Sequence, residues 1–325
     1  MPLERPIASP ISPFGLGLAA VGRPGYINLG RKADLPAERS VDALRAHAHR
    51  LLDAAYERGV RYVDAARSYG MAEEFLATWL EGRPDAQDVV IGSKWGYTYT
   101  AGWHTDADVH EVKDHSAATY DRQLAETRAL LGTRLNLYQI HSVTPDSPAL
   151  TDPALHERLA ALGAEGVTIG LSTSGPAQAD AIRAALEITV GGEALFGSVQ
   201  ATYNLMEPSV GPALAMAHAT GRRVIVKEAM ANGRLADRHA MWPDTTALRK
   251  IAREAGASCD ALALAAVAAR PWADIVLSGA ATVEQLTSNL TAADLHLNLD
   301  QLEQLAGLAE PAEAYWAQRA RLAWA

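Results

Sequence analysis

The segment RYVDAARSYG (residues 61–70) places an aspartate at the end of a short apolar run and a tyrosine five residues further on. The run from Val60 to Asp64 is too short for a helix and has the β-branched and aromatic composition of a buried strand. Burying a polar group without a hydrogen-bond partner costs roughly 2–7 kcal/mol. We therefore expect neighbouring segments to supply polar partners for Asp64 and Tyr69.

The sequence on either side alternates between short apolar runs and amphipathic segments. Eight runs are typical of parallel strands buried on both faces: 14–20, 60–64, 88–94, 135–141, 167–172, 198–203, 223–228 and 274–279. Helical patterns lie at 41–59, 72–81, 116–132, 152–163, 176–188, 209–220, 245–269 and 283–292. Eight such units without a polar linker favour a closed parallel (β/α)₈ TIM barrel over two open sheets. We expect one α/β barrel domain over residues 1–325, with rim loops and extra terminal helices.

Two segments fall outside this repeat. Residues 95–115, WGYTYTAGWHTDADVHEVKDH, form a long aromatic-rich connection after the third strand. Long loops at a barrel rim commonly line or cover the active site. The tail 310–325, EPAEAYWAQRARLAWA, is either a helix packed on the outside of the barrel or a segment that lines a pocket or a dimer contact.

Composition excludes several classes of partner. The net charge of −9 argues against nucleic acid or an anionic membrane as the main partner. The most apolar stretch, 261–269, is too short to span a bilayer, and the opening MPLERPIASP lacks the apolar core of a signal peptide. The single cysteine, Cys259, cannot form an intramolecular disulfide. We expect a cytoplasmic protein whose oligomeric state the sequence leaves open.

Four polar side chains follow consecutive strands of the predicted barrel. Asp64, Lys94 and His141 end the second, third and fourth strands, and Tyr69 follows Asp64 in the same loop. Any one of them alone is more often a helix cap or a satisfied core group. Because active sites of these barrels lie at the C-terminal ends of the strands, we interpret the four together as a catalytic site.

These four residue types suit proton delivery to a carbonyl oxygen. An ammonium beside a phenol favours the phenolate, so we expect Lys94 to lower the pKa of Tyr69 from its usual ~10. Asp64 would keep the lysine charged and oriented. His141 could donate a hydrogen bond to the same substrate oxygen. The accompanying hydride must come from a cofactor, since no side chain supplies one.

The chain resembles the aldo-keto reductase family over nearly its whole length. Six motifs match in order and spacing: GVRYVDAARSYG (59–70), VIGSKWG (90–96), LYQIHSV (137–143), IGLSTSG (169–175), SVQATYNL (198–205) and VLSGAATVEQLTSNL (276–290). The resemblance implies that Asp64, Tyr69, Lys94 and His141 are the catalytic tetrad. It also implies reduction of an aldehyde or ketone, a small-molecule carbonyl substrate, with a nicotinamide cofactor extended over the barrel mouth.

The resemblance also implies positions for the cofactor. Those at the nicotinamide are Ser172, Gln200 and Lys227, the last standing where the family usually has an aromatic ring. Those at the adenosine end are Gly279, Ala281, Gln285 and Asn289. Family habit favours NADPH, yet no Lys or Arg lies between 271 and 318, so NAD stays open. Helix N-terminal amides near Thr282 could instead bind the phosphate.

We expect Tyr26, Trp95 and Trp103 to line the substrate pocket, with residues 95–115 as a wall. Aromatic walls suit an apolar or cyclic carbonyl compound. The same tetrad could also serve a sugar or alcohol dehydrogenase that runs in the oxidative direction. A third candidate is a regulatory module that binds the cofactor with little turnover.

A metal-dependent barrel hydrolase is the alternative suggested by His47 and His49. Two ligands spaced by one residue share a face only on a strand. This pair lies in a helical pattern, which would direct the two rings roughly 200° apart. We therefore expect no metal site.

Overall fold

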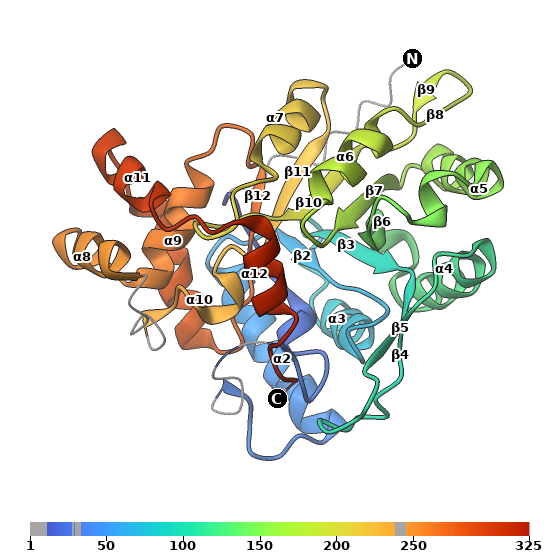
Figure 1. The fold of residues 1–325 in the computed structure, drawn as a ribbon. Coiled ribbons are helices and arrows are strands. Elements are labelled where there is room, and N and C mark those ends of the chain that lie inside the picture. The colour runs from blue at the N-terminus through green and yellow to red at the C-terminus, as the bar shows by residue number, and fades with distance from the viewer. Residues whose placement is uncertain (1–11, 28, 30–33, 238–244, 325) are drawn as a thin grey trace.

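The computed structural model describes residues 12–27, 29, 34–237 and 245–324. Eight parallel strands close into a barrel in the order β1-β12-β11-β10-β7-β6-β3-β2, with the helices around it (Figure 1). The barrel strands are β1 (Phe14–Gly17), β2 (Tyr62–Asp64), β3 (Val90–Trp95), β6 (Leu135–Val143), β7 (Thr168–Thr173), β10 (Ser198–Thr202), β11 (Arg223–Lys227) and β12 (Ile275–Ser278). The predicted (β/α)₈ fold is confirmed. Residues 1–11, on which the expected absence of a signal peptide depends, lie outside the described residues.

Several helices begin at a residue whose side chain caps the first turn. The helices packed around the barrel are α2 (Val41–Glu57), α3 (Ala72–Glu81), α4 (Ala117–Leu131), α5 (Pro153–Ala164), α6 (Gln178–Leu186), α7 (Gly211–Ala219), α8 (Thr246–Glu254), α9 (Cys259–Ala268) and α10 (Val283–Leu290). Ser116 caps α4 and Asp152 caps α5 by accepting from backbone amides of the first turn. The single helix predicted over 245–269 is wrong. Gly256, with φ of +64°, follows α8, and Ser258 caps a separate α9.

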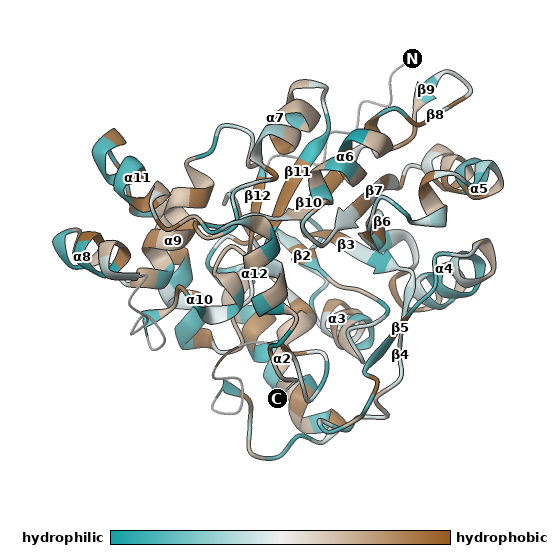
Figure 2. Ribbon diagram, viewed as in Figure 1, coloured by the Kyte–Doolittle hydropathy of each residue, from teal (hydrophilic) through white to brown (hydrophobic). Residues whose placement is uncertain are grey.

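The barrel interior is packed around Tyr62, which is fully buried. A Cβ atom on Gly92 would lie 2.3 Å from the Tyr62 hydroxyl oxygen, and one on Gly15 would lie 2.8 Å from its ring. Only glycine leaves room for the ring at these two strand positions. The hydroxyl donates to Asp64 Oδ1 at 3.3 Å, so the barrel floor supports the residue at the end of β2. Hydrophobic residues gather on the strands, while the helices alternate hydrophobic and hydrophilic segments (Figure 2).

Two segments cover the C-terminal mouth of the barrel. Within residues 95–115, β4 (Tyr97–Tyr99) and β5 (Glu111–Lys113) pair antiparallel, so the predicted long loop contains a hairpin. After α10 the chain forms α11 (Leu299–Ala306), and the tail 310–325 then forms α12 (Ala312–Arg319), which lies in front of the barrel in Figure 1. Elsewhere β8 (Thr189–Val190) pairs with β9 (Glu193–Ala194). Within the described ranges, no helix has both the length and the apolar composition needed to cross a bilayer.

Candidate active site

The four predicted side chains meet at the mouth of the barrel. Lys94 Nζ donates to the Asp64 carboxylate, to the backbone oxygen of Ala65 at 2.9 Å and to the Tyr69 hydroxyl at 3.3 Å. The ring centroids of Tyr69 and His141 lie 5.5 Å apart in an edge-to-face arrangement. All four side chains are buried. The structure therefore brings together the residues that the sequence placed at successive strand ends.

Three more side chains, Gln200, Tyr62 and Ser68, contact this cluster. The second oxygen of Asp64 accepts from Gln200 Nε2 at 2.9 Å, in addition to the Tyr62 hydroxyl. His141 Nδ1 lies 3.4 Å from the Ser68 hydroxyl. Asp64 thus has three donors inside the barrel: Lys94, Gln200 and Tyr62. An acid can be buried at this position because its charge is paired and its oxygens are hydrogen-bonded.

The loop that presents Tyr69 is fixed by two glycines. A Cβ atom on Gly22 would lie 2.3 Å from the backbone oxygen of Tyr69, and Gly70 adopts a φ of +63°. Met71 N–H donates to the Gly22 oxygen at 2.8 Å, so the loops after β1 and β2 are bonded together. This close approach allows little freedom for the phenol.

Burial has the largest effect on the pKa values of Tyr69 and His141. It raises the pKa of the Tyr69 phenol well above its usual value, and the Asp64 charge raises it further, whereas the Arg23 guanidinium lowers it. The lowered pKa that the sequence suggested is therefore wrong for this site. Burial also lowers the pKa of His141 well below its usual value, and nearby positive charges act in the same direction. At neutral pH the site thus holds a protonated phenol beside a neutral imidazole.

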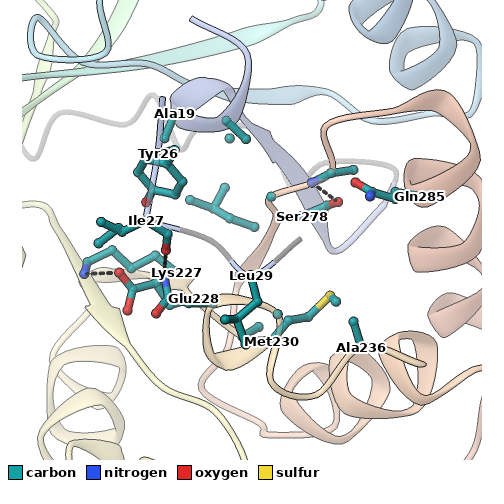
Figure 3. Close-up of a pocket in the computed structure, with 18 of the residues that line it drawn as sticks. Ala19, Tyr26, Ile27, Leu29, Lys227, Glu228, Met230, Ala236, Ser278 and Gln285 are labelled. Carbon is teal, nitrogen blue, oxygen red and sulfur yellow. Dashed lines mark hydrogen bonds and ion pairs between the residues drawn. The ribbon is translucent and has the colours of Figure 1, made fainter. Parts of the chain in front are cut away.

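A cavity of about 500 Å³ opens in front of this cluster. Asp64, Tyr69 and His141 line one end, and Gln285 and Asn289 line the other. In the close-up of Figure 3, Lys227 and Glu228 lie on the opposite side of the pocket from Gln285. A ligand that filled this cavity would reach from the Tyr69 phenol to Gln285.

Of the three aromatic residues predicted to line the substrate pocket, the structure places Tyr26 on its wall and the other two elsewhere. Trp95 is fully buried, and its ring packs against Tyr120 of α4 at a centroid distance of 5.1 Å. The Nε1 of Trp103 donates to the backbone oxygen of Arg39 at 2.7 Å. The predictions for Trp95 and Trp103 are therefore wrong, because each indole is held by packing away from the cavity.

The predicted cofactor positions divide in a similar way. Gln200, Lys227, Gly279, Gln285 and Asn289 line the cavity. Ser172 does not; its hydroxyl accepts from the backbone N–H of Ser142 at 2.8 Å and so supports the chain beyond His141. Ala281 is also outside the lining, and its backbone N–H donates to Gln285 Oε1 at 2.8 Å. Direct contact of Ser172 and Ala281 with a ligand is therefore not supported by this geometry.

The histidines that suggested a metal site face different elements. His47 Nε2 lies against the Ala281 carbonyl oxygen, and His49 Nε2 lies 2.9 Å from the Phe75 carbonyl oxygen. In the described part of the chain, no group of three or more His, Cys, Asp or Glu side chains is placed to hold a metal ion.

A sequence model of the Aldo/keto reductase family matches residues 37–310. The chain belongs to the aldo-keto reductase family. A curated relative, the aldo-keto reductase str7 of Strobilurus tenacellus, is 28% identical over 136 residues, which are 42% of this chain and 34% of the relative. That match therefore spans about a third of the relative's length.

Solved aldo-keto reductase structures share the fold. The holo form of an aldo-keto reductase from Bacillus halodurans superposes with a TM-score of 0.68, covers 92% of both chains and is 23% identical. A structure from Pseudomonas aeruginosa assigned to the aldo-keto reductases has a TM-score of 0.63 at 26% identity and covers 90% of this chain and 95% of its own.

In this aldo-keto reductase, the end of β11 carries an ion-pair cluster. Lys227 Nζ donates to the Thr202 hydroxyl at 2.8 Å and lies 3.9 Å from Glu228 Oε1. Arg319 of α12 donates to both oxygens of Glu228. Burial lowers the pKa of Lys227 to about 8. Burial alone would raise the pKa of Glu228, but the Arg319 and Lys227 charges hold it at about 2.

A further cation, not expected from the sequence, lies at the active end of the cavity, which is the end lined by Asp64, Tyr69 and His141. Arg23, in the loop after β1, is 1% exposed and lines the cavity. It donates to the Ser68 oxygen and to Glu111 Oε1, both at 2.7 Å, and lies over the rings of Tyr26 and Trp324. The available signal was the single arginine within the otherwise uncharged segment 12–30.

Proposed function

We propose that this chain is an NAD(P)H-dependent oxidoreductase that reduces an aldehyde or ketone to an alcohol, with Tyr69 as the proton donor. The main support is one contact set: Lys94 Nζ bonds both the Asp64 carboxylate and the Tyr69 hydroxyl at the end of a long cavity. The bound nicotinamide would supply the hydride to the carbonyl carbon.

The chain's own residues would handle the proton and the developing charge. The Tyr69 hydroxyl gives its proton to the substrate oxygen, and the phenolate that remains is compensated by the ammonium of Lys94, 3.3 Å away. His141, a neutral imidazole by the direction of its pKa, donates a hydrogen bond to the same oxygen. Asp64 keeps the ammonium in place.

The protonation of Tyr69 favours the reductive direction. Oxidation of an alcohol would need the phenolate as a base, whereas burial and the Asp64 charge raise the pKa of the phenol well above its usual value. At neutral pH the proton needed for reduction is therefore present on Tyr69. This protonation state suits carbonyl reduction, and in the oxidative direction the same phenol would first have to lose its proton.

The residues of the cavity fit a nicotinamide dinucleotide. Gln200 Oε1 is buried, lines the cavity and has no hydrogen-bond partner among the described residues, so it could accept from a carboxamide. Asn232 Oδ1 is a second such acceptor in the wall. At Gly279, a Cβ atom would meet nothing within 4 Å, which leaves the wall open to a ligand.

The test is a Tyr69→Phe variant assayed with a panel of aldehydes and ketones at the nicotinamide absorbance. Loss of the general acid should lower kcat by roughly 10²–10⁴-fold while cofactor binding persists. Tyr97→Phe is the matched control, because this phenol also packs beside His141 at a centroid distance of 5.0 Å but belongs to the hairpin. It should keep kcat within about threefold of the parent.

Two results would contradict the proposal. Unchanged kcat in Tyr69→Phe would remove this phenol from the mechanism. Tight cofactor binding by the parent protein without turnover of any carbonyl compound would favour the regulatory module. The cytoplasmic location, the single domain over 1–325 and an apolar or cyclic carbonyl substrate stay predictions, as does the NADPH preference taken from family habit.

A further inference from the structure

The two ends of the cavity differ in charge. At the active end the lining includes the cations Arg23, Lys227 and Arg319. At the other end it includes the carboxylates Asp237, Asp260 and Glu284, and no Lys or Arg among the described residues there. A ligand that extends from the phenol to Asn289 therefore meets an acidic wall at its far end.

These carboxylates either belong to α9 and α10 or accept hydrogen bonds from residues of these helices. Asp260 accepts from the Ser288 hydroxyl at 2.7 Å, and Asp237 accepts from the Cys259 backbone N–H at 2.9 Å. Glu284 lies in the first turn of α10 and is exposed on the cavity wall. Their hydrogen bonds keep the carboxylates in place without supplying a positive charge.

At the N-terminus of α10, an ordinary site for a phosphate, some of the backbone N–H groups already donate to this chain's own side chains. The Ala281 N–H donates to Gln285 Oε1 at 2.8 Å, and the Gln285 N–H donates to the Thr282 hydroxyl at 3.2 Å. Glu284 accepts from its own backbone N–H and from the Thr282 hydroxyl. A phosphate at this position would compete with these side chains for the amides of Ala281, Glu284 and Gln285.

Two side chains of α2, His47 and Arg50, lie behind this wall and outside the cavity lining. His47 Nε2 contacts the carbonyl oxygen of Ala281, and the Arg50 guanidinium lies 3.4 Å from His47 Nδ1. The wall itself, at Gly279, Gln285 and Asn289, has hydrogen-bonding groups or open space. The hydrogen-bonding groups of this wall could bind the hydroxyls of a ligand.

We propose that this end of the cavity selects NAD(H) over NADP(H), with Glu284 and Asp260 as specificity-determining residues; this rests on the function proposed above. A ribose 2′-hydroxyl can donate to a carboxylate. A 2′-phosphate, with a charge of about −1.5 to −2, would lose water and face these carboxylates, with no Lys or Arg among the described lining residues at this end to pair with it. The proposal differs from the NADPH preference that family habit implied.

The test is equilibrium titration of the full chain with NADH and with NADPH, followed by nicotinamide fluorescence. We expect NADH to bind at least about tenfold more tightly. The preference should weaken as salt is raised, because exposed charges are screened. These Kd values do not depend on turnover, so the proposed catalysis is tested separately.

Two variants test whether Glu284 determines the preference for NADH over NADPH. Glu284→Lys should improve NADPH binding by at least about fivefold, so that the preference shrinks or reverses. Glu303→Lys changes the charge equally on an exposed position of α11 and should leave the ratio of Kd values within about twofold. Both positions are exposed, so both variants should fold.

Each outcome has a definite meaning. NADPH binding as tight as NADH, or tighter, overturns the selectivity and leaves the proposed reductase function standing. A preference for NADH that Glu284→Lys does not change also overturns it, because the selection would then lie elsewhere. Binding of neither dinucleotide overturns the selectivity and the proposed function together.

Discussion

Replacing Asp64 by asparagine should destabilise the protein strongly. Its carboxylate is 2% exposed and accepts from Lys94, from Gln200 at 2.9 Å and from Tyr62 at 3.3 Å. An amide has only one oxygen, and its NH₂ group would face donors. The substitution also leaves the Lys94 ammonium buried without a counter-charge. Removing one partner of a buried ion pair costs about 3–5 kcal/mol, so we expect a loss of this size in the free energy of unfolding.

Urea unfolding followed by circular dichroism measures this loss, and a double-mutant cycle with Lys94→Met separates the pair from the individual residues. Removing both charges together leaves no uncompensated ion. The double variant should therefore lose at least about 2 kcal/mol less than the sum of the single variants. Asp121→Asn is the control, because its pair with Arg158 is 46–52% exposed and should be worth no more than about 1 kcal/mol.

An additive cycle, or a loss for Asp64→Asn no larger than that for Asp121→Asn, would refute this argument. It would mean that solvent, and not the protein, neutralises the Lys94 charge. The pair would then be unable to hold the ammonium beside the Tyr69 hydroxyl, and the proposed proton donor would lose its support.

The cluster at the end of β11 supports two further predictions. The pKa of Lys227 is lowered from 10.5 to about 8, so the unfolded chain binds more protons than the folded chain between these two pH values. The free energy of unfolding of the parent should therefore rise by about 3 kcal/mol relative to that of Lys227→Met as the pH increases through this window. Equal pH dependence of the two proteins in urea unfolding would contradict this. Glu228, with a pKa lowered to about 2, contributes stability that is present above its ordinary pKa of 4.5 and is lost only as pH falls towards 2. In Arg319→Met the pKa of Glu228 should rise, so acid unfolding should begin at a higher pH than in the parent. Coincident acid unfolding curves would show that the Arg319–Glu228 ion pair is not needed for this stability.

The barrel was predictable because buried parallel strands are short continuous apolar runs. The runs at 60–64 and 198–203 agree with β2 and β10 to within two residues. The break in 245–269 was harder to detect, because alanine-rich sequence continues on both sides of Gly256. The hairpin of β4 and β5 could not be foreseen, since its strands are three residues each and are separated by eleven residues that contain no short turn signal.

The site was predictable where strand geometry alone places a side chain. Asp64, Lys94 and His141 meet because the ends of parallel barrel strands meet. The same geometry explains the error at Trp95: neighbouring side chains on a strand point to opposite faces, so with Lys94 directed into the barrel, Trp95 points outward to α4. Arg23 lay beyond this reasoning, because its partner Glu111 is 88 residues away in sequence.

The arrangement of charge explains why the phenol, and not the imidazole, carries a proton to donate in the proposed mechanism. Lys94, Lys227 and Arg23 all lower the pKa of His141, so this ring holds no extra proton to give at neutral pH. Burial and Asp64 raise the pKa of Tyr69, so its proton stays on until a substrate oxygen becomes basic. In the proposed mechanism, the cations that prevent protonation of the histidine also stabilise the negative charge that forms on the substrate oxygen and then on the phenolate. The same buried cations would thus keep His141 neutral and stabilise the charge that forms when Tyr69 gives up its proton.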